Sequence, residues 1–212
     1  TMRNSANRAW LENHFSPLIT HSSPSSRAVV RNPVGSDPPC GSVSPNAPIE
    51  SIRDIAGSQR SRCSGVPPAW IDYNGHLNEG YYGVAFGDAS DALLDHLGFD
   101  GEYRENHGTF YTVETRIRFL REVHEGSEIH AATLLLGADE KRLHVHHDLL
   151  AGDSPDPVAT QEAMMLHVAR GPDGPGVAPM SEPLLGRALA LATLHSTVSP
   201  GDHVGRGVRT LR

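Results

Sequence analysis

Residues 70–98 read WIDYNGHLNEGYYGVAFGDASDALLDHLG, and this stretch decides the fold. Apolar residues recur at three- and four-residue spacing through its second part, which predicts one apolar face of an α-helix. Asn78 is a favourable N-cap and the closing glycine is a natural stop, so the helix should run over Glu79–Leu97. Gly83 and Gly87 inside it each cost about 1 kcal/mol relative to Ala, for which close approach of a sheet or a ligand would be one compensating reason.

Four segments after this helix have sequence patterns that predict four successive strands. The first, residues 109–121, alternates apolar and polar residues with the period of two that a half-buried strand shows. Turn-like connections between the later segments suit antiparallel neighbours. A long apolar helix followed by strands indicates an α+β domain with an antiparallel sheet curled around the helix. The other predicted elements are a short extended piece from residue 66, strands at 128–136, 142–150 and 157–169, and a helix at about 183–195.

The charge is unevenly divided along the chain. The 212 residues carry a formal net charge of −7, which separates into +3 for residues 1–65 and −10 for residues 66–212. The first section is rich in Ser and Pro, and its sparse apolar residues cannot bury enough surface to offset the entropy of ordering. We therefore expect a mostly disordered extension over 1–65, one domain over 66–197 and a loose tail over 198–212.

Composition also excludes several classes of protein. An acidic balance argues against nucleic-acid binding, which needs basic patches to neutralise phosphates. No run of about 18 apolar residues is present, so the sequence predicts no membrane-spanning helix. Two cysteines cannot build a disulfide framework, which favours a reducing compartment. We expect a cytoplasmic protein that has neither nucleic acid nor a membrane as a partner.

Polar residues at alternate positions lead directly into the long helix. Asp72, Asn74, His76 and Asn78 lie in the loop just before it. A helix N-terminus presents unpaired N–H groups and partial positive charge, which can polarise a carbonyl and hold a developing oxyanion. A nearby carboxylate can attack that carbonyl or deprotonate water for the attack. This arrangement suffices for thioester or ester hydrolysis, although the same residue types are also ordinary loop and cap residues.

The pattern Asp-x-Asn-x-His-x-Asn-x-x-x-Tyr, which ends at Tyr82, resembles the hotdog-fold acyl-CoA thioesterases of the 4-hydroxybenzoyl-CoA thioesterase type. The blocks GTFYTVETRIRFLREVHEGSEI, VATQEAMMLHV and VAPM resemble a narrower group, the betainyl-CoA thioesterases of carnitine catabolism, which also occur fused to L-carnitine dehydrogenase. The resemblance covers residues 66–195. It implies hydrolysis of betainyl-CoA to betaine and free CoA, no cofactor, and a homodimer or a dimer of dimers.

The same resemblance implies roles for single residues. Asp72 would be the catalytic carboxylate, as nucleophile or as general base. His76 would order the loop or adjoin the substrate, and Asn78 would cap the helix and shape the site. Many relatives carry a second Asn where this chain has Glu79, which leaves open whether Glu79 assists the chemistry, contacts a cationic substrate or only favours the helix start.

A betainyl group carries a trimethylammonium cation, which binds favourably over aromatic faces. We expect two or three members of an aromatic set to contact it, with Tyr73 favoured because it adjoins Asp72, while the others belong to the core or to a dimer interface. Asn74 is a further candidate for substrate binding, and Glu79 or Glu114 could balance the cation. The aromatic candidates are Trp70, Tyr73, Tyr81, Tyr82, Phe110 and Tyr111.

Anionic CoA requires local positive charge, which Arg116, Arg118 and Arg121 could supply, although a solvated strand face explains them equally well. His144 and His146 alternate on one predicted strand face, but no spacing fixes a third ligand, so we expect solvent-facing side chains and no metal site. Two other functions remain open beside betainyl-CoA hydrolysis: a thioesterase for another short or aromatic acyl-CoA, and a non-catalytic acyl-CoA-binding domain.

Overall fold

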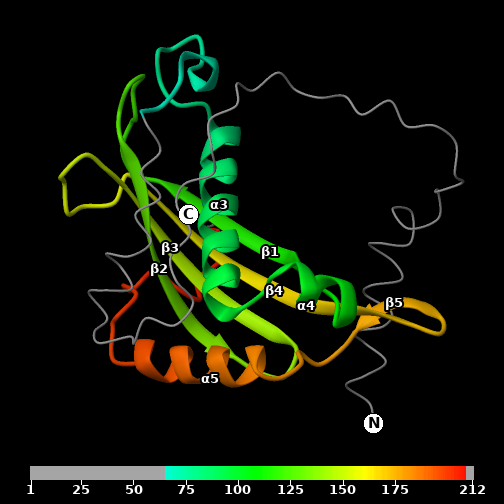
Figure 1. Ribbon diagram of the computed structural model, residues 1–212. Helices are drawn as coiled ribbons and strands as arrows, with labels where there is room; N and C mark the ends of the chain where they lie inside the picture. The colour runs from blue at the N-terminus through cyan, green and yellow to red at the C-terminus, as the bar shows by residue number, and fades with distance from the viewer. Residues whose placement is uncertain (1–64, 209–212) are drawn as a thin grey trace, which may run out of the picture. The chain divides into compact units, whose positions relative to one another are not determined.

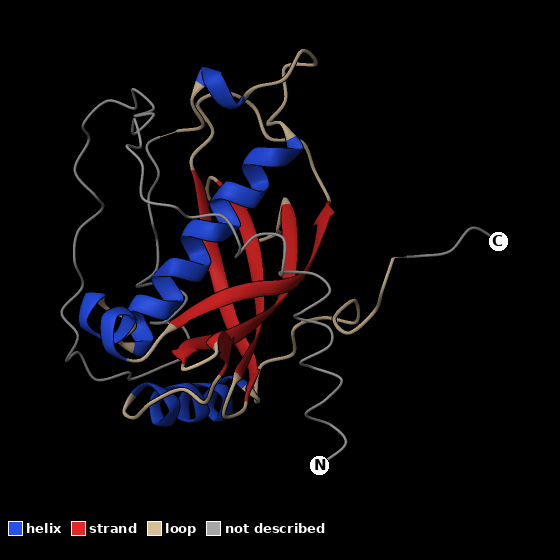
Figure 2. Ribbon diagram, turned by 90° about the vertical axis from the view of Figure 1, so that its right-hand side faces the viewer, coloured by secondary structure: helices blue, strands red, loops and turns tan. Residues whose placement is uncertain are grey.

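The computed structural model describes residues 65–208, which form an antiparallel sheet with a long helix across one face (Figures 1 and 2). The strand order is β1-β4-β3-β2, and the short β5 pairs with β4. The α+β prediction is therefore confirmed. The extension that we predict over residues 1–65 lies almost wholly outside the described residues. The elements are α3 (Glu79–Leu97), α4 (Gly101–Asn106), β1 (Thr109–Phe119), β2 (Ile129–Ala138), β3 (Arg142–Ala151), β4 (Ala159–Gly171), β5 (Gly174–Val177) and α5 (Leu184–His195).

Helix α3 has the bounds that the sequence predicts. The Asn78 side chain accepts a hydrogen bond from the Gly80 N–H, and Gly98 ends the helix in the left-handed conformation with φ of 90°. Close approach of this chain's own sheet does not explain Gly83 and Gly87, because a Cβ on either would meet no atom of the described chain within 4 Å, and approach of a ligand stays a prediction. The buried face of α3 consists of Tyr82, Phe86, Ala89, Ser90, Leu93, Leu94 and Leu97.

The predicted strands are confirmed with ends shifted by one or two residues, but three local features differ. The piece at Pro68–Trp70 is a 3-10 turn and not an extended segment, because proline is well suited to a first helical turn. The periodicity also gave no sign of α4 or β5. In β1 a bulge between Thr112 and Glu114 shifts the register against β4, so the alternating pattern does not produce one continuous buried face.

Two apolar clusters lie along α3. One surrounds its C-terminal half and packs against α5 and the middle of the sheet. The other surrounds its N-terminal half and includes Val66, Leu77, Phe86 and Val123, all at most 4% exposed. This second cluster fixes the position of the loop that enters α3. Among the described residues, no helix combines the length and apolar content that crossing a bilayer requires.

A buried polar chain links α3 to the sheet. The Ser90 hydroxyl donates to the Phe86 carbonyl oxygen at 3.0 Å, so its oxygen accepts from His147 Nε2 at 3.1 Å. Thr133 Oγ1 then donates to His147 Nδ1 at 2.8 Å. The His147 ring is fully buried and neutral in this arrangement. Burial and the neighbouring His146 lower the pKa of His147 to about 3, against the opposing effect of the Asp148 carboxylate.

This histidine should make stability depend on pH. Its folded-state pKa of about 3 lies below the unfolded value of about 6.5, so its stabilising effect is complete above pH 6.5 and is lost as pH falls toward 3. We expect the wild type to lose about 2 kcal/mol through this group between pH 7 and pH 5. Urea unfolding at both pH values should show that His147→Gln loses less over this interval, and an equal loss would contradict the assignment.

Candidate active site

Asp72 organises a tight turn before α3. Its N–H donates to the His76 carbonyl at 2.8 Å, and its own carbonyl accepts from the Gly75 N–H at 3.0 Å. Gly75 has φ of 81°, a conformation that glycine adopts readily. The turn is closed by an antiparallel bridge between Ile71 and Leu77. Asn74-Gly75, a pair that is typical of tight turns, therefore forms the tip of this one.

The Asp72 carboxylate is held within the same turn. Its Oδ1 accepts the N–H of Asn74 at 2.8 Å and the N–H of His76 at 3.3 Å. Desolvation raises the pKa of Asp72, but these two N–H groups, an Asn74 side-chain hydrogen bond and the nearby His76 outweigh it, so the pKa lies below its usual range. The group is thus an anion at neutral pH, as a general base or a nucleophile must be.

The antiparallel pairing that closes the turn continues to the start of α3. The Asn78 N–H donates to the Trp70 carbonyl at 2.9 Å, so Asp72 is two residues, or roughly 7 Å, beyond that pair. The predicted N-cap is confirmed, and it occupies the Gly80 N–H at 2.9 Å. The Tyr81 N–H donates to the Asn78 carbonyl at 3.0 Å, and the Glu79 N–H, at the first helical position, has no acceptor within the helix.

A second segment, residues 122–124, lies beside the turn, although no sequence pattern indicates that it belongs to the site. The Leu77 N–H donates to the Val123 carbonyl at 2.7 Å. On either side of Val123, the Glu122 carboxylate approaches His76 Nε2 at 3.3 Å and His124 Nδ1 contacts the Gly75 carbonyl at 3.2 Å. The segment follows β1 at the end of a predicted strand, and no motif marked it as part of a site.

Two of the predicted aromatic residues contact each other near α3. The Trp70 and Tyr81 rings are stacked, with centroids 4.9 Å apart and an interplanar angle of 12°. Tyr73 is 97% exposed at the tip of the Asp72 turn, whereas Tyr82 is 4% exposed and packs edge-on against Phe119. Tyr82 is therefore a core residue within this chain, and Asn74 and Glu79 are exposed.

Phe110 and Tyr111 do not join this group in one protomer. The Phe110 ring packs against Phe99, just beyond the C-terminal end of α3, at a centroid distance of 5.3 Å. Tyr82 and Phe99 are separated by about 25 Å along the helix direction, at 1.5 Å per residue. The six aromatic residues are thus divided between the two ends of α3, with Tyr111 exposed at the far end of β1.

The three candidate arginines lie on β1 or just after it. Arg116 donates to the carbonyls of His203 and Arg206, and Arg121 donates to the carbonyl of Asp156. Both guanidinium groups are therefore engaged with backbone oxygens, whereas Arg118 is half-buried. Glu114 is an exposed residue of β1.

The histidines of β3 are not simply solvent-facing. His144 Nε2 lies 2.9 Å from the Glu162 carboxylate, and His146 Nε2 lies 3.0 Å from that of Asp148. His146 is only 1% exposed, because the segment after α5 covers it and places His203 at a ring distance of 5.3 Å. The predicted exposure of His146 is therefore wrong. Residues 198–208, predicted as a loose tail, contact this sheet face.

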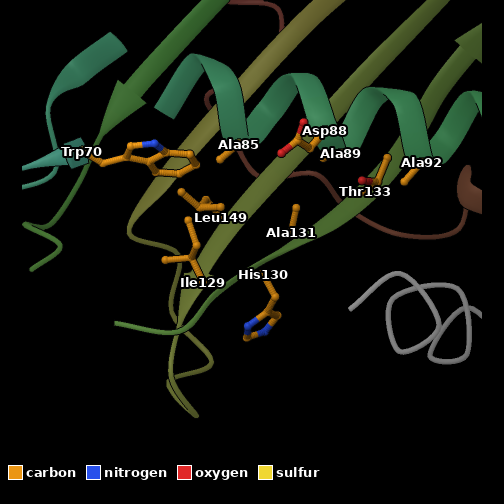
Figure 3. Close-up of a pocket in the computed structure, with 10 residues that line it drawn as sticks. All are labelled: Trp70, Ala85, Asp88, Ala89, Ala92, Ile129, His130, Ala131, Thr133 and Leu149. Carbon is orange, nitrogen blue, oxygen red and sulfur yellow. The ribbon is translucent and has the colours of Figure 1, made fainter. Parts of the chain in front are cut away.

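A small cavity lies between α3 and β2, with Trp70 at one end and Thr133 and Ala92 toward the other (Figure 3). The Asp88 carboxylate also lines it. A volume of about 20 Å³ is open to the centre of a water molecule, which leaves room for one or two waters. This cavity is too small for the acyl group of an acyl-CoA. The Asp72 turn and the start of α3 therefore remain the candidate site.

Comparisons with known proteins identify the family. The thioesterase-like superfamily matches residues 66–187. The chain is 43% identical to the betainyl-CoA thioesterase of Pseudomonas aeruginosa over 142 residues, which cover 66% of this chain and 88% of that protein. It is 44% identical to the L-carnitine dehydrogenase/betainyl-CoA thioesterase of Agrobacterium fabrum over 147 residues, which cover 69% of this chain and 30% of that longer protein.

Solved structures give the same result for the fold. A candidate thioesterase from Pseudomonas putida KT2440 superposes with a TM-score of 0.61 at 33% identity, covering 70% of this chain and 94% of that one. The chain therefore belongs to the thioesterase-like superfamily, and it is a thioester hydrolase with the hotdog fold.

Proposed function

We propose that this protein hydrolyses betainyl-CoA to betaine and free CoA, a step in carnitine breakdown. The observation that carries this proposal is the 43% identity to the Pseudomonas aeruginosa enzyme over 88% of its length. The ordered, ionised Asp72 carboxylate beside a helix N-terminus supports it chemically. The proposal places the enzyme in the cytoplasm, in keeping with the two cysteines of the chain.

In the proposed reaction, Asp72 takes a proton from a water molecule while that water attacks the thioester carbonyl. The carbon–sulfur bond of the tetrahedral intermediate then breaks, and the CoA thiolate leaves with the proton that Asp72 took, which restores the carboxylate. Direct attack by Asp72, through a mixed anhydride that water hydrolyses, is the alternative route. Neither route consumes a cofactor.

The developing oxyanion needs hydrogen-bond donors fixed in advance. The start of α3 supplies them, because its first N–H groups lack helical partners and carry partial positive charge. The Asn78 side chain already occupies the Gly80 N–H, so we assign the oxyanion contact to the Glu79 N–H. The Glu79 carboxylate, exposed at the same point, would attract the trimethylammonium group.

We also propose a homodimer in which β1 pairs antiparallel with its copy. In the described part of the chain β1 pairs only with β4, which leaves its other edge open to a partner. Antiparallel pairing places the start of one β1 beside the end of the other, so the partner's Tyr111 would approach the Asp72 end of this chain. The aromatic set would then be completed between two protomers.

For CoA, we favour Arg118 among the three arginines, since Arg116 and Arg121 are engaged with backbone carbonyls. Within one protomer the aromatic candidates are divided between the two ends of α3, so a single chain does not surround a cation with them. This observation favours, as a second candidate, a thioesterase for another short or aromatic acyl-CoA.

Substrate selectivity tests the cation directly. Betainyl-CoA and 3,3-dimethylbutanoyl-CoA have acyl groups of the same shape and differ in the charge at the quaternary atom. We expect kcat/KM to be about tenfold or more higher for betainyl-CoA, because cation–π and carboxylate contacts act on the cation alone. Thiol release measured for both substrates checks this, and equal values would refute the betainyl assignment while leaving thioesterase activity intact.

Replacement of the catalytic carboxylate has a matched control. We expect Asp72→Asn to lower kcat by a factor on the order of 10²–10⁴, because the amide can neither accept the proton nor attack. Asp139 also accepts two backbone N–H groups in a turn, from Lys141 and Arg142, but lies between β2 and β3. Asp139→Asn should retain the wild-type rate. A near-wild-type rate for Asp72→Asn would remove Asp72 from the mechanism.

The composite site predicts complementation between two defective chains. In a mixed dimer of Asp72→Asn and Tyr111→Ala chains, one site carries both defects and the other carries neither. Co-refolded mixtures should therefore regain about a quarter of wild-type activity when heterodimers form statistically. If the mixture shows only the mean of the two parents, or if the wild type sediments as an active monomer, the proposed β1 interface is wrong.

A further inference from the structure

We propose that His76, Glu122 and His124 form a binding site for a divalent transition-metal ion, with Zn²⁺ as the favoured class of ligand. One ligand atom from each of the three side chains lies within 4.8 Å of the other two. The sequence gives no motif for such a site, because His76 is separated by 46 positions from Glu122. The proposal is independent of the substrate and concerns the segment beside the catalytic turn.

Backbone pairing brings the three ligands together. The hydrogen bond from the Leu77 N–H to the Val123 carbonyl, 2.7 Å long, places the end of the Asp72 turn alongside residues 122–124. Val123 is 2% exposed and belongs to the core cluster around the start of α3. Because side chains of an extended segment alternate in direction, Glu122 and His124 project together on the outer side, next to His76. The core thus fixes the spacing of the ligands.

The separations suit coordination by a small cation. His76 Nε2 and Glu122 Oε2 are 3.3 Å apart, and the rings of His76 and His124 lie 5.1 Å apart at an angle of 66°. Zinc–nitrogen and zinc–oxygen bonds of about 2.0–2.1 Å give neighbouring ligand atoms a separation of about 3.3 Å in a tetrahedron. The His76–Glu122 pair therefore already has a suitable spacing, and a ligand atom of His124 lies within 4.8 Å of both partners.

The tautomer of His124 is also suited to a metal. Its Nδ1 lies 3.2 Å from the Gly75 carbonyl oxygen, which can only accept, so Nδ1 carries the proton. Nε2 of the neutral ring then keeps its lone pair for a ligand. A ring N–H donated to a backbone carbonyl is the arrangement that orients most metal-binding histidines. Here the carbonyl belongs to the Asp72 turn itself.

Two imidazoles and one carboxylate favour Zn²⁺, Co²⁺ or Ni²⁺ over Mg²⁺ and Ca²⁺, which prefer oxygen ligands. Partial exposure, with side-chain values of 32% for His76 and 68% for Glu122, leaves room for water in the remaining positions. A bound ion would connect the Asp72 turn to the segment after β1. It would therefore stabilise the loop that holds the catalytic carboxylate, without itself entering the reaction.

Titration of the untagged full-length protein with Co²⁺, followed by d–d absorption and by calorimetry, tests this site. We expect one ion per protomer, with half-saturation at about 10 µM or below. His124→Gln and Glu122→Gln should each weaken binding by about tenfold or more. Glu125→Gln changes an exposed carboxylate in the same segment that lies outside the cluster, and it should bind like the wild type.

Thermal unfolding gives a second readout that is independent of catalysis. Zn²⁺ at 100 times its dissociation constant should raise the Tm of the wild type by about 5–10 °C and should raise that of Glu122→Gln much less. Glu122 is largely exposed, so this variant should fold, which circular dichroism verifies. Absence of stoichiometric binding, equal affinity in the variants, or a thiolate-to-Co²⁺ band that places the ion on Cys40 or Cys63 would each overturn the proposal.

Discussion

The Asp72 carboxylate accepts hydrogen bonds from the N–H groups of Asn74 and His76 in its own turn. The geometry of the candidate site depends on this interaction. It folds the chain back so that Ile71 pairs with Leu77 and Trp70 with Asn78. The chain therefore enters α3 at a defined angle, with a cap already in place. The same contacts lower the pKa of the carboxylate, so the interaction that shapes the loop also keeps ionised the group that we propose as catalytic.

The rest of the domain holds this turn in place. Leu77 and Val123 are buried in the cluster at the start of α3, and their hydrogen bond joins the turn to the segment after β1. Farther along the helix, the Ser90–His147–Thr133 chain joins α3 to the sheet through fully buried polar atoms. The long helix is thus fixed at its start by backbone pairing and in its middle by a satisfied polar network, which leaves its exposed N-terminus available to a ligand.

Much of the fold could be predicted because local signals and tertiary packing agree. The bounds of α3 follow from the Asn78 cap, the closing glycine and the spacing of apolar residues between them. The bulge at Thr112 could not be predicted, because it arises from pairing with β4 and leaves no mark on the alternation of β1. The short β5 has only four residues, GPGV, whose composition is typical of a loop.

The site was predictable in part for the same reason. Asp72, Asn74 and His76 are close in sequence, so their contacts are local. Glu122 and His124 join them only through the pairing of Leu77 with Val123, which no local pattern indicates. Which aromatic residues contact the substrate stays a prediction, but within one chain Phe110 lies at the opposite end of α3 from Trp70 and Tyr81, which no local pattern indicates.

The most direct test of the central claim is the release of free thiol from betainyl-CoA by the purified full-length protein under multiple-turnover conditions. The structure and its relatives predict sustained release of many equivalents of CoA per protomer. Tight, stoichiometric binding of betainyl-CoA by the folded protein, with no thiol released, would contradict the assignment and would identify a binding domain in its place.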